Sequence, residues 1–117
     1  MLREAMGELA DRVEIQGGKR QEGSLSPTDT PIYEAMARAV EKLVPGSQIV
    51  PAMTTGGTDA RFFRWRGVPS YGFGLHSSRI PYTEYPAMFH GHNERVDTES
   101  LLLSTLLWDT LCRDFLG

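Results

Sequence analysis

The chain has 117 residues, of which 40% are apolar and 23% are charged, and its formal net charge at pH 7 is -3. This length fits one domain or part of one. The mild acidity argues against nucleic acid and anionic membranes as main partners, because both require a clustered basic face. No stretch approaches the roughly 20 apolar residues of a membrane span, and acidic residues stand near the N-terminus where a signal peptide has an apolar run. We therefore expect a cytoplasmic protein.

The first part of the chain predicts a helix followed by a strand. Residues 2–11 carry apolar side chains at helical spacing, and residues 12–16 alternate apolar and polar. The polar, proline-containing residues 24–29 have no periodicity. We therefore expect two units, residues 1–23 and residues 24–117.

A second helix is predicted to begin at Thr30 and Pro31. A threonine hydroxyl caps a helix start, and proline loses nothing there because its missing N–H would have no partner. Pro45 ends this helix, and residues 48–51 are a short β-prone segment. Apolar side chains at helical spacing give the helix a buried stripe of Ile32, Met36, Ala39, Val40 and Leu43.

A Gly-Gly-Thr-Asp turn at residues 56–59 opens a third helix that extends through Arg66. Thr58 or Asp59 is expected to cap it, and Gly67 to take the left-handed conformation that closes it. The turn has two interpretations, an anion site built from backbone N–H groups or simply a tight turn that needs glycine. The arginines of this helix, at positions 61, 64 and 66, are more typical of a solvated face than of an anion site.

Residues 68–73 predict an apolar strand, and residues 74–96 are too long for a plain turn, since loops of that length are usually functional or disordered. Asp97 then caps a long helix that runs to about Phe115. Because leucines and Trp108 leave only a narrow polar stripe, we expect this helix to be largely buried. The only cysteine, Cys112, is expected to be a buried thiol in it, not a nucleophile.

Alternating helices and strands predict an α/β unit with short parallel strands. In such sheets, sites lie beyond the carboxyl ends of the strands. Both the turn at residues 56–59 and the His-rich stretch at residues 90–94 follow a predicted strand. We therefore expect both to open at the same edge of the sheet.

His90, His92 and Glu94 form a candidate metal cluster. In an extended chain, alternate side chains point the same way, so all three would face one ion, and imidazoles and carboxylates are usual zinc ligands. The pattern alone favours surface or structural histidines. A serine nucleophile at Ser77, after His76, is disfavoured because the sequence has no Gly-x-Ser-x-Gly elbow.

Three motifs stand in order along the chain: Gly57-Thr-Asp-Ala-Arg-Phe, Gly67-Val-Pro-Ser-Tyr-Gly-Phe and His90-Gly-His-Asn-Glu-Arg-Val. Together they resemble the C-terminal end of the aminoacylase, carboxypeptidase G and succinyl-diaminopimelate desuccinylase family of zinc-dependent exopeptidases and amidohydrolases. The resemblance runs from about Ser26 to the C-terminus, and the aminoacylase-like branch is closest. It implies that residues 24–117 are the C-terminal part of an α/β catalytic domain and residues 1–23 the end of a lid, or dimerisation, domain.

The resemblance also implies roles for the motif residues. His90, the first histidine of a His-x-x-x-Glu pattern, would ligate one of two zinc ions, for which cobalt or manganese could substitute. His92 and Glu94 would support the loop through hydrogen bonds and would not be ligands.

In the Gly-Thr-Asp turn, the resemblance implies contact with the substrate. Backbone groups of Gly57 and Thr58 would hold the substrate carboxylate, and Asp59 and Arg61 would brace the turn.

The family's other metal ligands and its general base lie upstream, and nothing in this sequence matches them. We therefore expect a C-terminal fragment of a metal-dependent peptidase or amidohydrolase that cleaves an amide bond next to a free carboxylate, in an N-acyl amino acid or small peptide, and that is inactive alone. Two alternatives stay open: a non-catalytic interaction or dimerisation module, and a self-contained mononuclear metal-binding protein built on His90, His92 and Glu94. A homo-oligomer also stays open.

Overall fold

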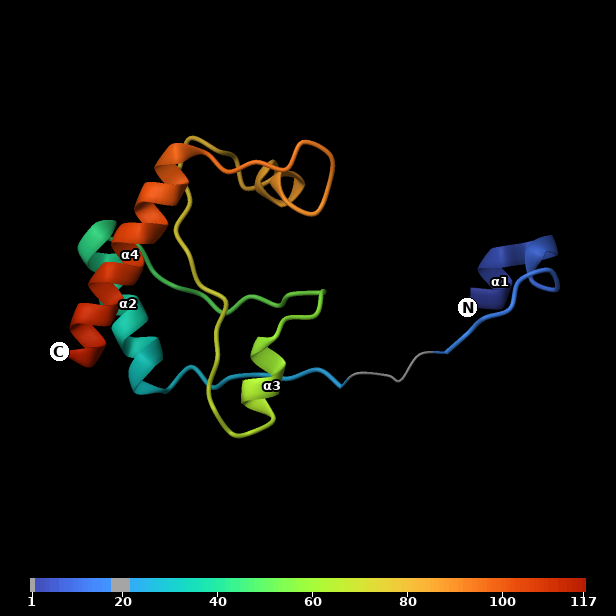
Figure 1. Ribbon diagram of the computed structural model, residues 1–117, viewed down its shortest axis with the longest axis horizontal. Coiled ribbons are helices and arrows are strands. Elements are labelled where there is room, and N and C mark those ends of the chain that lie inside the picture. The colour runs from blue at the N-terminus through green and yellow to red at the C-terminus, as the bar shows by residue number, and fades with distance from the viewer. Residues whose placement is uncertain (1, 18–21) are drawn as a thin grey trace.

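The computed structural model describes residues 2–17 and 22–117. Figure 1 shows α2 and α4 side by side at one end of the molecule and α1 at the other. None of the helices in the described ranges is long and apolar enough to cross a membrane. In chain order the helical elements are α1 (Leu2–Met6), the 3-10 helix η1 (Gly7–Leu9), α2 (Pro31–Leu43), α3 (Ala60–Arg64), the 3-10 helix η2 (Tyr85–Met88) and α4 (Thr98–Leu116).

The core lies where α2 packs against α4. Tyr71, Phe73 and Leu75 pack against it from the loop before η2, and Leu107 is the largest side chain that is completely buried among the described residues. The predicted stripe of α2 is confirmed, because its central residues are buried and Ile32 and Leu43 pack at the margin. The buried side chains of the core are Ala35, Met36, Ala39, Val40, Leu107 and Leu111.

The predicted start of α2 is confirmed. Thr30 is the N-cap, its hydroxyl oxygen accepts a hydrogen bond from the Tyr33 N–H at 3.3 Å, and Pro31 is the first helical residue. The Tyr71 hydroxyl donates to the Pro27 carbonyl at 2.6 Å and lies 2.7 Å from the Thr30 hydroxyl. The cap therefore also fastens the loop at residue 71 to the start of α2.

The prediction that Gly67 closes α3 in a left-handed conformation is confirmed. Its φ is +77°, a left-handed conformation that glycine adopts without a steric penalty. The Gly67 N–H donates to the Arg64 carbonyl at 2.9 Å and the Val68 N–H to the Phe63 carbonyl at 3.0 Å. This pair of bonds is a Schellman motif, and it turns the chain sharply into the next loop.

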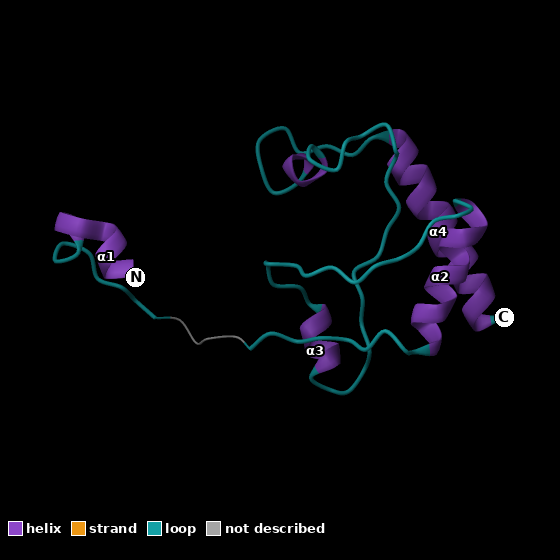
Figure 2. Cartoon of the chain, turned by 180° about the vertical axis from the view of Figure 1, so that it is seen from behind, coloured by secondary structure: helices purple, strands orange, loops and turns teal. Residues whose placement is uncertain are grey.

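The predicted strands are not found in the described residues, which contain helices, turns and loops (Figure 2). A strand exists only where its backbone N–H and C=O groups pair with a neighbouring chain segment. Residues 13–16, 48–51 and 68–73 make no such ladder with another described segment. The α/β class and the helix–strand lid remnant at residues 1–23 are therefore not what this structure shows; in that part it has α1 and η1.

The expectation that α4 is largely buried is wrong for this chain. Ser100, Leu107 and Leu111 are its buried residues, and Cys112 is exposed. The physical reason is that α2 covers one side of α4, while no other described element packs on the remainder. The exposed apolar side chains of α4 are Leu101, Leu102, Leu106, Trp108, Phe115 and Leu116.

Candidate metal and substrate site

His90 lies in a loop that closes on itself between η2 and α4. The Arg95 N–H donates to the Met88 carbonyl at 2.9 Å, and a Glu94 carboxylate oxygen accepts a hydrogen bond from the His90 N–H at 2.6 Å. His90 and Asn93 both have φ of 59°, a left-handed conformation that is uncommon outside glycine. These two residues reverse the chain, so the loop is a turn whose backbone is fixed by the Glu94 side chain.

This turn contradicts the extended geometry predicted for His90, His92 and Glu94. In a turn, alternate side chains no longer point the same way. Among the described residues, no group of three or more His, Cys, Asp or Glu side chains could hold a metal ion. The exposed imidazole of His90 can supply one ligand, whereas a catalytic zinc site takes three from the protein. The described residues therefore do not form a self-contained metal site.

A hydrogen-bond network holds the preceding loop to the start of α4. Asp97 is the N-cap of α4, as predicted, and its carboxylate accepts a hydrogen bond from the Ser100 N–H at 2.8 Å. The Ser100 hydroxyl in turn accepts from the Ser77 N–H at 2.8 Å. The Ser77 hydroxyl donates to Glu99, which also accepts from the Arg79 guanidinium at 2.7 Å. Among the described residues, the Ser77 hydroxyl thus bonds to a carboxylate and to the Arg79 N–H, with no imidazole or amine as a partner that would activate it as a nucleophile.

Glu99 is the acidic centre of this network. The hydrogen bond from the Ser77 hydroxyl, together with Arg79, holds the pKa of the Glu99 carboxyl below its ordinary value of 4.5. A lowered pKa in the folded state means that the unfolded chain binds more protons. The resulting stability is present above pH 4.5 and is lost as the pH falls through the lowered pKa.

We expect Glu99→Gln to flatten this part of the pH dependence of stability. The midpoint of thermal unfolding of the wild type should fall as the pH drops below 4.5, and that of the variant should fall less because its amide does not titrate. Glu14→Gln, at an exposed position in the N-terminal segment, is the matched control and should follow the wild type. Parallel curves for the wild type and Glu99→Gln would show that Glu99 contributes nothing to the pH dependence.

The Gly-Gly-Thr-Asp turn leads directly into α3. A Cβ on Gly57 would lie 2.9 Å from Nη1 of Arg61, so the arginine occupies the space that a side chain would need. The Arg61 guanidinium also lies over the Phe62 ring, 4.7 Å from its centroid. Asp59 is at the N-cap position of α3 but makes no side-chain cap bond, so the predicted side-chain cap is wrong, and backbone bonds start the helix.

The turn and the His loop do not come together among the described residues. Figures 1 and 2 show α3 and the loop after η2 at separate positions on the molecule, with α3 on the lower side of both views. The expectation of a shared edge required a sheet, and the described residues contain none. The expected roles of His90, Gly57 and Thr58 thus remain predictions.

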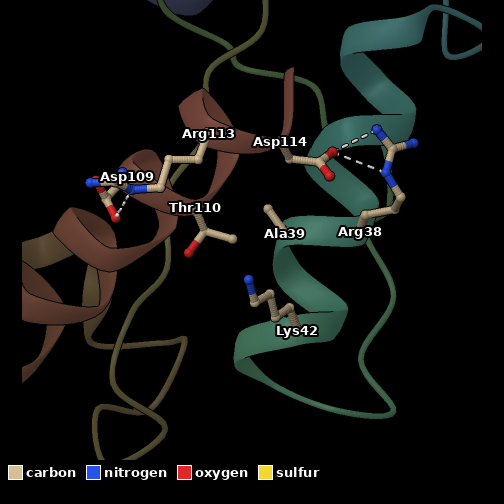
Figure 3. Close-up of a pocket in the computed structure, with 7 residues that line it drawn as sticks. All are labelled: Arg38, Ala39, Lys42, Asp109, Thr110, Arg113 and Asp114. Atoms are coloured by element: carbon tan, nitrogen blue, oxygen red, sulfur yellow. Dashed lines mark hydrogen bonds and ion pairs between the residues drawn. The ribbon is translucent and has the colours of Figure 1, made fainter. Parts of the chain in front are cut away.

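Two of the pockets on the surface of the described residues have charged residues in their walls. One, of about 170 Å³, lies beside the His loop and is lined by Ile80, Glu84, Met88, Arg95, Val96 and Asp97. The other, of about 330 Å³, lies between α2 and α4 (Figure 3).

The larger pocket has charged walls. The Arg38 guanidinium donates to the Asp114 carboxylate at 2.6 Å and Arg113 donates to Asp109 at 2.9 Å (Figure 3). The bond from Arg113 holds the pKa of the Asp109 carboxyl below its ordinary value. Because each acid already has an arginine partner, this pocket is not a metal site.

Aromatic side chains that belong to none of the three motifs surround the His loop. Tyr85 and Phe89 are four residues apart, and their rings lie 5.2 Å from each other. Tyr85 begins the 3-10 helix η2 and Phe89 is its extended C-cap residue, so no helical spacing in the sequence signalled this contact. His76 stacks on Tyr85 with ring centroids 3.7 Å apart. Partial burial lowers the pKa of His76, although the Asp97 carboxylate acts in the opposite direction.

Comparison with known families defines the class of protein as a peptidase. The chain belongs to peptidase family M20/M25/M40, whose family model matches residues 7–114. Members of this family are generally metal-dependent, usually with zinc. No curated protein and no solved structure gave a significant match.

Proposed function

We propose that this chain contributes one metal ligand and a substrate-holding turn to a zinc-dependent hydrolase of the aminoacylase-like branch of its family. The substrate class is an N-acyl amino acid or small peptide, cleaved at the amide bond next to a free carboxylate. The observation that carries this proposal is the family match over residues 7–114, within which the three motifs lie.

In this proposal His90 is the ligand. Its imidazole is exposed, while its backbone is fixed by Glu94 and by the bond between Arg95 and Met88. A bound zinc ion supplies Lewis acidity and lowers the pKa of its water. A metal ligand needs a fixed direction, and the closed loop provides it. The role of Glu94 is then to hold the loop, which is the contact it makes.

The turn at Gly57 and Thr58 would receive the substrate carboxylate. Gly57 and Thr58 are both exposed, so a ligand can approach their backbone N–H groups. The Arg61 guanidinium lies directly against Gly57 and adds positive charge beside the turn. Hydrogen bonds from backbone N–H groups to an ionised carboxylate are charge-assisted, and they are about twice as strong as neutral ones.

The chain alone is proposed to be inactive. A single imidazole provides neither three ligands nor a general base, and the described residues hold no group of three ligand-type side chains that could bind a metal ion. The zinc site would therefore be completed by residues outside this chain.

The test is a zinc titration of the purified chain, followed by calorimetry and by the NMR signals of the histidine rings. We expect weak binding that shifts the ring signals of His90, is lost in His90→Ala and persists in His92→Ala. Tight one-to-one binding would instead indicate a complete site within this chain.

In an enzyme that completes the site, His90→Ala should lower hydrolysis of an N-acyl amino acid by more than about 100-fold, since even residues that support a ligand contribute 10–100-fold. Near-normal turnover there would overturn the assignment of His90.

A further inference from the structure

Four aromatic rings contact one another in series between the start of α4 and the His loop. The His76 and Tyr85 centroids are 3.7 Å apart, those of Tyr85 and Phe89 5.2 Å, and those of Phe89 and His90 5.4 Å. We call the four residues His76, Tyr85, Phe89 and His90 the ring row. It connects the proposed metal ligand to a part of the fold that lies fourteen residues earlier in the sequence.

The first end of the ring row is anchored to α4. The residue before His76 is held because the Ser104 hydroxyl donates to the Leu75 carbonyl at 2.8 Å. The residue after it is held because the Ser77 N–H donates to the Ser100 hydroxyl at 2.8 Å. Ser100 and Ser77 are both buried. The backbone on both sides of His76 is thus fixed to the longest helix of the molecule.

The other end of the ring row is His90, whose imidazole must point in a fixed direction to bind a metal ion. The hydrogen bonds of the loop fix the His90 backbone, but its side chain can still rotate about its own bonds. Its ring meets the Phe89 ring edge-on, at 82°. The Phe89 ring in turn meets the half-buried ring of Tyr85 at 63°. Restricting rotamers before a ligand binds lowers the entropy lost on binding.

We propose that Tyr85 is a positioning residue for His90. Its ring joins the anchored His76 to Phe89 and thereby holds the His90 imidazole in one direction. The proposal deepens the proposed function, since it rests on His90 as a metal ligand. The Tyr85 hydroxyl makes no hydrogen bond with the described residues, so the ring itself carries the effect, and phenylalanine should replace tyrosine without loss.

The experiment compares Tyr85→Leu with Tyr85→Phe in the whole chain. The first readout is the NMR signals of the His90 ring without metal, assigned by their absence in His90→Gln; the chain has only three histidines. We expect these signals to move toward unfolded-chain positions in Tyr85→Leu and to stay in place in Tyr85→Phe. Tyr82→Leu is the matched control, because Tyr82 is 82% exposed and outside the ring row. The second readout is the zinc concentration at the midpoint of the shift of the His90 signals. This concentration should rise about tenfold in Tyr85→Leu.

The two readouts separate this proposal from the proposed function. Unmoved His90 signals in Tyr85→Leu overturn the positioning role, whatever zinc does. If the His90 signals move in Tyr85→Leu but the wild-type signals do not respond to zinc, the positioning role is upheld and the ligand role is overturned. If Tyr85→Leu loses helix by circular dichroism, His76→Leu removes the anchored ring from an exposed position, and unmoved His90 signals in that variant overturn the proposal equally.

Discussion

Replacement of Leu107 by alanine is expected to destabilise the chain by about 3–5 kcal/mol, toward the upper end of the range for buried leucine. Leu107 has no exposed surface and lies at the contact of α2 with α4. Removing its side chain forfeits the transfer free energy of the lost methyl and methylene groups and leaves a cavity among Met36, Val40 and the other core residues. Because this core has only six buried residues in the described part of the chain, few other contacts remain to compensate. Thermal or urea unfolding followed by circular dichroism measures the change.

Leu102→Ala is the control for this substitution. It makes the same chemical change on the same helix, but Leu102 is 57% exposed, and substitutions at such positions usually change stability by less than about 0.5 kcal/mol. Equal losses of unfolding free energy in the two variants would mean that α4 does not pack against α2 through Leu107.

The parts of the fold that follow from local chemistry could be predicted from the sequence. Thr30 and Asp97 cap their helices through bonds to residues three positions later, and Gly67 closes α3 through backbone bonds within one turn. Such contacts need only neighbouring residues, so the sequence pattern determines them. The stripe of α2 was equally readable, because helical spacing places its apolar side chains on one face.

The strands and the burial of α4 could not be predicted in the same way. An apolar segment such as residues 68–73 becomes a strand only when another segment pairs with it, and which segment pairs is not a local property. Leu101 and Leu106 are as apolar as Leu107, but only Leu107 faces α2. Apolar content sets how much surface a helix can bury, and packing partners decide how much it does bury.

In the candidate site, too, some features could be predicted from neighbouring residues and others depend on distant ones. The spacing of His90, His92 and Glu94 predicted three side chains facing one ion, whereas the Glu94 carboxylate accepts a hydrogen bond from the His90 N–H. The extended geometry failed because the left-handed φ of Asn93 and His90 turns the chain. The contact of His76 with Tyr85 was beyond prediction, since it depends on how the loop before α4 is anchored by Ser77.

Arg64 illustrates how a side chain in an apparently solvated cluster becomes structural. Its Nε donates to the Ser70 carbonyl at 2.9 Å and to the Ser26 hydroxyl at 3.1 Å, and its Nη1 donates to the Ser24 hydroxyl at 3.0 Å. The Ser26 hydroxyl is itself buried and accepts from the Ser70 N–H at 2.8 Å. One guanidinium thus joins α3 to the segment before α2 and to the loop after α3.

Replacement of Arg64 by alanine is therefore expected to lower the free energy of unfolding by about 2 kcal/mol, because hydrogen bonds to a charged donor contribute about 1.5–3 kcal/mol each when partly buried. Arg64→Lys should recover only part of the loss, since one ammonium cannot reproduce the fork that reaches Ser24 and Ser70 together. Arg66→Ala, at an exposed position just beyond α3, is the matched control and should stay within about 0.5 kcal/mol of the wild type. Urea unfolding measures all three variants. Equal stability of Arg64→Ala and Arg66→Ala would show that the bonds of Arg64 to Ser24, Ser26 and Ser70 contribute nothing measurable to the free energy of unfolding.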